Sequence, residues 1–183
     1  GTLNMTAPCR PNMTISPLAQ VKGIEVHRGP SKVLEGASVN IGAGEIVSVM
    51  GDNGSGKTTL IEAFAGILPL RSGEVIWHEG GESILVRDSD GRRNPPPPLG
   101  LTLQKGGISG EETVSERLAV SLSVAGIQSH EGQIADLLGH WGLGHRSEDR
   151  VAHLSGGLRR RLSILCGLAP AALSETPRVV LLD

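Results

Sequence analysis

The segment Gly51-Asp52-Asn53-Gly54-Ser55-Gly56-Lys57-Thr58 decides the fold, because it has the pattern Gly-x-x-x-x-Gly-Lys-[Ser/Thr]. This pattern is typical of a phosphate-binding loop, in which glycines let successive backbone N–H groups turn inward and approach phosphates closely. Lys57 is expected to reach the β- and γ-phosphates of a nucleoside triphosphate, and the Thr58 hydroxyl is expected to bind Mg²⁺. We therefore predict that residues 51–58, together with the following Thr59, surround the phosphates.

The sequence around this loop predicts the strand and the helix that such a loop requires. Residues 45–50 form a compact, β-branched run that predicts a buried strand leading into Gly51. Residues 58–67 predict an amphipathic helix that Pro69 closes, with an apolar stripe of Leu60, Ile61, Phe64 and Ile67. A helix that begins near Lys57 directs the positive end of its dipole at the bound phosphates.

The remaining sequence predicts an α/β fold with an inserted helical lobe. A strand is expected over residues 72–77, and helices over residues 113–143. A further helix through Leu162, Leu165 and Leu168, a Pro-rich irregular connection from Pro170 to Pro177, and a final strand over residues 178–183 are expected to follow. Residues 88–98 predict a polar loop that ends in four consecutive prolines. Such a loop serves either as a surface connection or as a docking site for a partner.

Composition and charge argue against several classes of protein. The net charge of −2 and the pI of about 6.3 give no overall electrostatic footprint for nucleic acid, so direct nucleic-acid binding is not expected. Cys9 and Cys166 are too far apart in the sequence to suggest a metal site or a disulfide framework. No apolar run reaches the roughly 18 residues of a membrane span. Residues 1–18 predict a flexible tail without a secretory signal.

A second motif identifies the family. Leu154-Ser155-Gly156-Gly157 precedes a basic amphipathic helix, and by itself it would be a helix N-cap followed by two flexible glycines. Because it stands between a phosphate-binding loop and an apolar strand ending in Asp183, it resembles the signature motif of the ABC ATPases. The resemblance runs from about residue 21 to the end of the sequence and includes Gln104 at the position of the family's Q-loop glutamine.

The resemblance implies the domain organisation. The fold class would be α/β, a P-loop NTPase core of the ABC ATPase type with an antiparallel β subdomain and an inserted helical subdomain. A flexible N-terminal tail would precede one ABC ATPase domain over residues 19–183. Within that domain, the nucleotide-binding core and β subdomain would cover residues 19–105, the helical subdomain residues 106–152, and the signature helix and Walker B strand residues 153–183.

The resemblance also implies a site shared between two subunits. Two ATP molecules with Mg²⁺ would be sandwiched in a head-to-tail dimer, where the segment Ser155-Gly156-Gly157 of one subunit completes the γ-phosphate site of the other. Gln104 would touch Mg²⁺ and the lytic water, and together with Lys57 it would make the catalytic contacts. Asp183 would be the Walker B aspartate, which holds Mg²⁺ mainly through water.

The sequence departs from the family pattern at three places. Leu158 replaces the glutamine that usually follows the signature glycines, which implies weaker signature contacts. Arg28, beside His27, stands where relatives carry the aromatic residue that stacks on adenine. An arginine plane can stack on a base, and a plain surface arginine is the alternative. The sequence ends at Asp183, before the family's catalytic glutamate, so we expect a truncated ATPase for which ATP binding is predicted and turnover is not.

These features favour an ATP-hydrolysing subunit of an ABC transporter, held by a separate membrane permease on the cytoplasmic, inner face of the cell membrane. Within the family, residues 28–29, 51–58 and 73–77 look like the haem-exporter ATPase of cytochrome c maturation. Gln104 and the signature Leu154-Ser155-Gly156-Gly157 fit that subfamily less well. Two alternatives stay open. One is a soluble ABC ATPase that acts on the ribosome or on DNA, and the other is a regulatory subunit that binds ATP without hydrolysing it.

Overall fold

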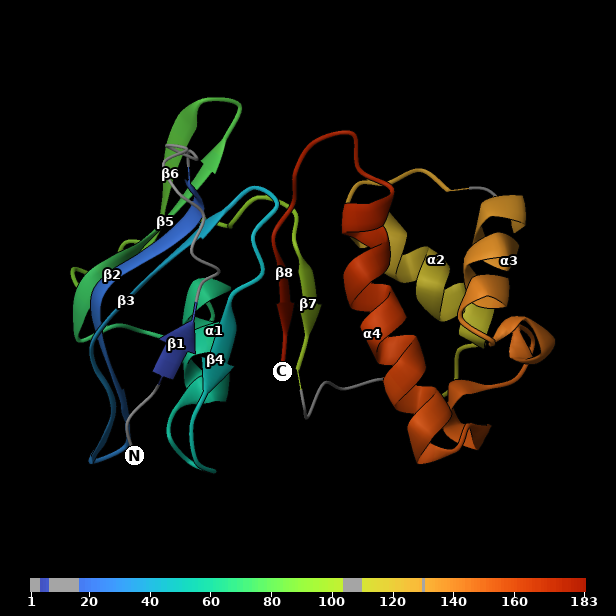
Figure 1. Ribbon diagram of the computed structural model, residues 1–183, viewed down its shortest axis with the longest axis horizontal. Coiled ribbons are helices and arrows are strands. Elements are labelled where there is room, and N and C mark those ends of the chain that lie inside the picture. Colours follow the sequence, from blue (N-terminus) through green and yellow to red (C-terminus); the bar gives the residue numbers. More distant parts are fainter. Residues whose placement is uncertain (1–3, 7–16, 104–109, 130) are drawn as a thin grey trace. The chain divides into compact units, whose positions relative to one another are not determined.

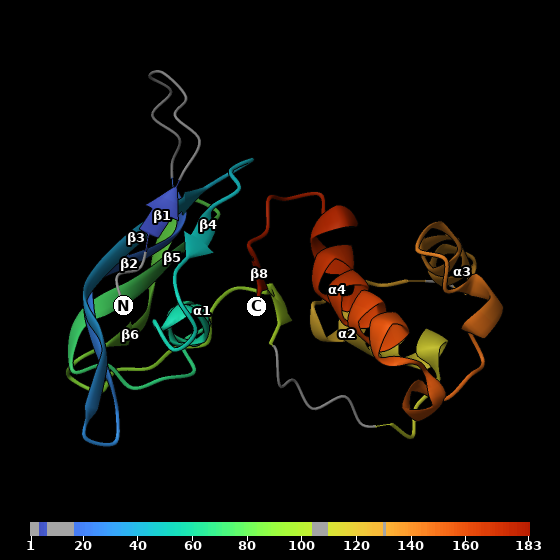
Figure 2. The same cartoon turned by 60° about the horizontal axis from the view of Figure 1, so that its bottom comes forward.

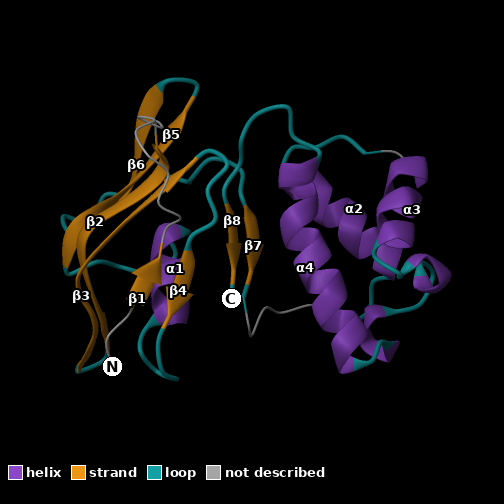
Figure 3. Ribbon diagram, in the orientation of Figure 1, coloured by secondary structure: helices purple, strands orange, loops and turns teal. Residues whose placement is uncertain are grey.

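The computed structural model describes residues 4–6, 17–103, 110–129 and 131–183 (Figure 1). The chain divides into two compact units, of which the first comprises Gly1–Pro97 with Asp183 and the second comprises Pro98–Leu182. Of the helices drawn in purple in Figure 3, α1 lies in the first unit by sequence, and α2, α3 and α4 lie in the second. The predicted metal and catalytic residue Gln104 lies outside the described residues.

A four-stranded antiparallel sheet forms the centre of the first unit. Its strand order is β3-β2-β5-β6. These strands span Pro17–Arg28 (β2), Ser31–Gly42 (β3), Ser72–Glu79 (β5) and Glu82–Asp88 (β6). Apolar side chains from one face of the sheet form the core, and they include Ala19, Val21, Ile24, Val26, Val75, Trp77 and Val86. Val and Ile provide most of these buried side chains, as suits a chain with few aromatic residues.

The strand β6 was not among the predicted elements, although the sequence carries a signal for it. Gly80 and Gly81 join β5 to β6, and both have a positive φ, of 58° and 85° respectively. Two consecutive residues with positive φ are what a two-residue hairpin turn of the favoured type requires. The Gly-Gly pair between two short apolar runs therefore indicates this hairpin.

The helix α1 spans Lys57–Phe64 and lies against β2 and β3. Its buried residues Leu60 and Phe64 belong to the predicted stripe, and the indole N–H of Trp77 donates to the Phe64 carbonyl at 3.0 Å. The prediction of a helix through residue 67 was wrong, because the chain turns at Gly66 with a φ of 70°. Ile67, which was expected on the apolar stripe, is 45% exposed.

The prediction of a buried strand over residues 45–50 was also wrong. Only Ser48–Met50 (β4) is extended, and it pairs antiparallel with Asn4–Thr6 (β1), a part of the predicted tail. Ile46 is 80% exposed and Met50 is 52% exposed. An apolar run is buried only where other elements cover it, and among the described residues β1 is the strand that pairs with β4.

The second unit combines three helices with a short parallel strand pair. The helices span Val114–Val124 (α2), Glu131–His140 (α3) and Gly156–Ala172 (α4), and α2 packs against α4 (Figure 2). Single 3₁₀ turns cover Gly144–Arg146 and Val151–His153. The strands Gly100–Thr102 (β7) and Val180–Leu182 (β8) lie in parallel register beside α4. Fully buried core residues of this unit include Val114, Leu118, Leu122, Leu138, Leu143, Val151 and Leu162.

The helix α4 continues through Pro170, where the sequence predicted an irregular connection. A proline inside a helix has no N–H to donate to the carbonyl four residues earlier, which here belongs to Cys166. The Ser121 hydroxyl of α2 donates to that carbonyl at 2.7 Å. A side chain from a neighbouring helix thus replaces the lost backbone hydrogen bond, which explains why the helix tolerates the proline.

Candidate functional site

The loop between β4 and α1 has the backbone geometry that its glycines predicted. Gly54 and Gly56 have φ values of 83° and 102°, a region that favours glycine. A Cβ atom on Gly56 would also lie only 2.9 Å from Leu34 Cδ2 and 3.2 Å from the Val33 carbonyl oxygen. Both the torsion and the lack of space therefore require glycine at position 56. The close packing places the loop directly against β3.

Lys57 curls back over this loop. Its ammonium group donates to the carbonyl oxygens of Gly51 and Asp52, at 2.7 and 2.8 Å. The loop is further closed by a hydrogen bond of 3.1 Å from the Ser55 N–H to the Asp52 carbonyl. The one cationic side chain of the motif thus lies across the loop, where it can neutralise the charge of a bound phosphate.

Two observations indicate that the loop is built for an anion. The hydroxyl of Ser55 is buried and has no hydrogen-bond partner among the described residues, and buried polar groups are normally paired. The helix α1 begins after Gly56 without a side-chain cap, and its first turn carries no acidic residue. The N–H groups of that turn have no acceptors within the helix, so this end of α1 favours a bound anion.

The side chains of Thr58 and Asp183 meet at this end of α1. Thr58 Oγ1 donates to Asp183 Oδ2 at 2.8 Å, although the two residues are 125 positions apart in the sequence. Asp183 follows β8 directly, and its contacts place it with the first unit. A hydroxyl and a carboxylate are oxygen ligands of the kind that Mg²⁺ prefers.

These residues fit a magnesium ion that arrives with a nucleotide. The described residues contain no group of three or more His, Cys, Asp or Glu side chains that could hold a metal ion by themselves. Mg²⁺ in nucleotide sites is commonly bound by one or two protein oxygens together with phosphates, and it keeps several waters. Thr58 and Asp183 supply such a partial set, next to a loop whose Ser55 hydroxyl is buried without a partner among the described residues.

The predicted signature residues lie at the start of α4, in the second unit. Ser155 is the N-cap, and its hydroxyl accepts from the Leu158 N–H at 3.4 Å. Ser155, Gly156 and Gly157 are exposed, and a Cβ atom on either glycine would meet no atom within 4 Å. This open surface is unlike the enclosed setting of Gly56. It leaves room for a molecule to approach the backbone at the helix N-terminus.

Comparison with known proteins identifies the family. The family model described as ABC transporter matches residues 34–183. The chain belongs to this ABC transporter family. The methionine import ATP-binding protein MetN of Brucella abortus (strain 2308) is 29% identical over 176 residues, which cover 95% of this chain and 46% of that protein. The cytochrome c biogenesis ATP-binding export protein CcmA of Nitrosomonas europaea is 34% identical over 143 residues, which cover 78% of this chain and 64% of CcmA.

Solved structures of ABC proteins show the same fold. The structure of an ATP binding subunit of an ABC transporter superposes with a TM-score of 0.67 at 24% identity, and it covers 84% of this chain and 62% of that one. The predicted ABC ATPase fold class is thereby confirmed. The chain spans about half the length of the first curated relatives that it matches. Within the described part, no helix is both long and apolar enough to cross a membrane.

Leu158, the main departure from the ABC signature, has a structural role. Its side chain is partly buried and packs against the hydrophobic core of the helical unit. In this position it contributes to the packing of α4 and offers no polar contact beside the exposed signature backbone. Members of the ABC family bind ATP together with Mg²⁺. In the signature of this chain, Ser155 keeps a polar side chain, and Gly156 and Gly157 keep open space above their backbone.

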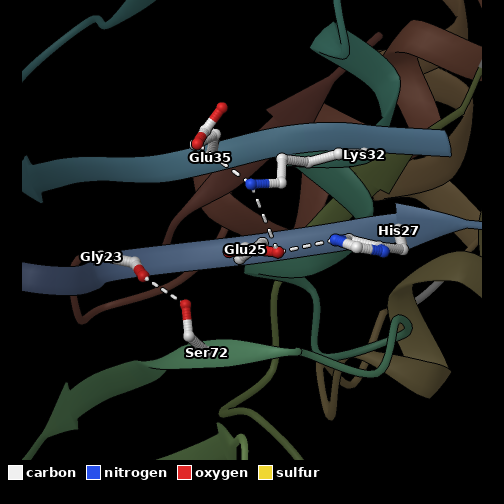
Figure 4. Close-up of polar contacts among 6 residues, drawn as sticks. All are labelled: Gly23, Glu25, His27, Lys32, Glu35 and Ser72. Atoms are coloured by element: carbon white, nitrogen blue, oxygen red, sulfur yellow. Dashed lines mark hydrogen bonds and ion pairs between the residues drawn. The ribbon is translucent and has the colours of Figure 1, made fainter.

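Arg28, at the predicted adenine position, and its neighbour His27 have different partners. His27 contacts the Glu25 carboxylate at 2.6 Å, and Lys32 lies 3.7 Å from the same carboxylate (Figure 4). The hydrogen bond from His27, aided by the charge of Lys32, lowers the pKa of Glu25 below its ordinary value. Arg28 instead forms an ion pair with Glu62 of α1. Sequence analysis did not single out Glu62, which has no place in the motifs.

Proposed function

We propose that this chain binds MgATP at residues 51–59 as the ATP-binding subunit of an ABC transporter. The observation that carries the proposal is the contact between Thr58 and Asp183, because it joins the two motifs expected to share one Mg²⁺ ion. The whole protein would hydrolyse ATP and so power transport through a separate membrane permease. Its place would be the cytoplasmic face of the membrane that holds the permease.

The proposed roles of the loop residues follow from their geometry. Lys57 would exchange its contacts with the loop carbonyls for the β- and γ-phosphates. The Ser55 hydroxyl and the N–H groups at the start of α1 would donate to phosphate oxygens, together with Thr59. Thr58 and Asp183 would hold Mg²⁺, which neutralises charge on the phosphates when bound.

The exposed signature segment supports a dimeric arrangement. Ser155, Gly156 and Gly157 would contact the γ-phosphate of ATP bound to a second ATPase subunit, in a head-to-tail dimer. Their exposure and the open space above both glycines suit a surface that meets another molecule. Gln104 is proposed to contact Mg²⁺ and the lytic water, as the family resemblance implies.

The comparisons support transport over the alternatives without selecting a cargo. The similar proteins include import and export proteins by name, for methionine, Fe³⁺ ions and cytochrome c biogenesis. Similarity to CcmA supports a haem-exporter type as a narrower proposal. A regulatory subunit that binds ATP without turnover is the second candidate, because Leu158 is packed into the helical core and cannot make the polar contacts of the usual glutamine.

Equilibrium binding of a fluorescent ATP analogue to the whole chain tests the proposal. The wild-type chain should bind it in the presence of Mg²⁺, and Lys57→Ala should weaken binding by about tenfold or more, because it removes a charge-assisted contact to phosphate. Lys32→Ala, which removes a cation from β3, is the matched control and should bind like wild type. Binding that is independent of Lys57 would refute the phosphate-site assignment.

A further inference from the structure

The polar side chains near the end of β2 point to opposite faces of the sheet. Ile24 and Val26 are buried in the core against which α1 packs. Glu25 and His27 point to the other face, where they meet Lys32 and Glu35 of β3 (Figure 4). Because side chains alternate along a strand, Arg28 follows Val26 on the face that carries α1.

Arg28 is held on that face by Glu62. Its guanidinium forms an ion pair with the Glu62 carboxylate, whose side chain is only 18% exposed. Glu62 lies four residues after Thr58 on α1, so the two side chains share one face of the helix a single turn apart. The pair therefore anchors the guanidinium one helical turn from the hydroxyl that is proposed to bind Mg²⁺.

The ion pair fixes the guanidinium without covering it. A carboxylate pairs with the N–H groups at the edge of the guanidinium plane, so the ion pair itself does not cover the planar faces that can stack on an aromatic ring. The Arg28 side chain is 49% exposed, which leaves that surface open. A free arginine would lose rotamer entropy on stacking, whereas a paired one has already lost part of it. The negative charge of Glu62 also offsets that of Arg28, so the pair adds little net charge beside a triphosphate.

We propose that Glu62 is a positioning residue for the nucleotide base, because it holds Arg28 so that the guanidinium plane stacks on the base of the bound nucleotide. The proposal rests on the function above, in which the triphosphate occupies residues 51–59. Stacking on a planar group tolerates different bases, since every base offers a π-face. The Arg28–Glu62 pair should therefore increase the binding affinity for ATP and for GTP to a similar extent.

A double-mutant cycle with two ligands tests this proposal on the whole chain. Arg28→Gln, Glu62→Gln and the double variant are titrated with MgATP and with magnesium tripolyphosphate, which has the phosphates but no base. Each single variant should bind MgATP about three- to tenfold more weakly, and the double variant should lose little more than either single one. The ratio of ATP affinity to tripolyphosphate affinity should fall in all three, because general charge effects act on both ligands alike.

Two control variants separate positioning from structure. Glu74→Gln breaks the exposed pair of Lys22 and Glu74 on the same sheet, and it should leave the affinity ratio unchanged. Arg28→Lys keeps the charge but lacks the plane, so it should behave like Arg28→Gln. Circular dichroism confirms that each variant is folded.

The outcomes distinguish this proposal from the one on which it rests. Wild-type affinity in Arg28→Lys, or equal losses for ATP and tripolyphosphate in the Arg28→Gln and Glu62→Gln variants, would overturn the positioning role. If Lys57→Ala weakens MgATP binding but Arg28→Gln and Glu62→Gln leave it unchanged, only the positioning role of Glu62 is refuted. If Lys57→Ala also leaves MgATP binding unchanged, the phosphate site itself is refuted.

Discussion

The hydroxyl of Thr58 donates a hydrogen bond of 2.8 Å to the carboxylate of Asp183. Thr58 is the last residue of the phosphate-binding motif, and Asp183 directly follows the apolar strand β8. The hydrogen bond keeps two oxygen ligands within reach of one cation, although 125 positions separate them in the sequence. Neither residue alone makes a metal site, and together they supply the two oxygens that we propose for a nucleotide-bound Mg²⁺.

Removing either oxygen should uncouple nucleotide binding from magnesium. Thr58→Val and Asp183→Asn should each weaken ATP binding about tenfold in millimolar Mg²⁺, because each removes a ligand or a charge-assisted contact. In EDTA both variants should bind ATP as weakly as wild type does. Isothermal titration calorimetry with and without EDTA measures this difference. Thr176→Val, in the exposed loop after α4, is the control, and an equal loss in EDTA would contradict the assignment.

Gly56 should be intolerant of even one methyl group. Gly56→Ala combines a positive φ with a contact of 2.9 Å to Leu34 Cδ2, and we expect a loss of about 1–3 kcal/mol in the free energy of unfolding. The control is Gly139→Ala in α3, where a Cβ atom meets nothing within 4 Å. This change should stabilise by up to about 1 kcal/mol. Urea unfolding followed by fluorescence reports on the two units through Trp77 and Trp141, and equal effects would refute the packing argument.

Ser121 should matter for stability because of Pro170. Ser121→Ala leaves the Cys166 carbonyl without the hydroxyl that donates to it, and a buried carbonyl without a partner costs about 1–3 kcal/mol. Pro170→Ala supplies a backbone N–H for the same carbonyl, so the double variant should recover much of the loss. Urea unfolding with Trp141 as reporter measures the cycle. Additive losses would show that the hydroxyl does not replace the missing N–H.

The contacts of Glu25 with His27 and Lys32 should make the stability of the folded chain fall at acid pH. The hydrogen bond from His27 holds the pKa of Glu25 below its ordinary value of 4.5, so the ionised carboxylate favours the folded state. That stability is present above about pH 4.5 and is lost as the pH falls through the lower, folded pKa. Glu25→Gln should therefore flatten the fall in urea midpoint between pH 5 and pH 3. Glu79→Gln, at the exposed end of β5, should leave the slope unchanged.

The motif-bearing parts of the fold could be predicted from sequence because local chemistry determines them. Gly56 and Lys57 set the loop and the helix start, and Ser155 caps α4 as its neighbours predicted. The apolar run before Asp183 likewise forms a strand, although the strand spans Val180–Leu182 and not the whole predicted range of residues 178–183. In each case a few adjacent residues are sufficient, and no distant partner is needed to fix the backbone.

The remaining features depend on contacts that the sequence does not show. Residues 45–50 have a strand composition, yet Ile46 and Met50 are exposed because burial depends on what covers a strand. Pro170 looks like a helix breaker until Ser121 is placed beside it. Glu62 is one acidic residue among many, and only its contact with Arg28 distinguishes it. Long-range pairing decides each of these outcomes.

Leu34 connects the hydrophobic core to the anion site, because it is buried and its Cδ2 atom limits the space at Gly56. The packing of this core residue should therefore influence ligand affinity at the proposed phosphate site. A larger or differently branched side chain at position 34 would displace the loop before it unfolded the sheet. Core substitutions in β3 should thus be compared by ligand affinity as well as by melting temperature, because both quantities depend on the packing of Leu34 against Gly56.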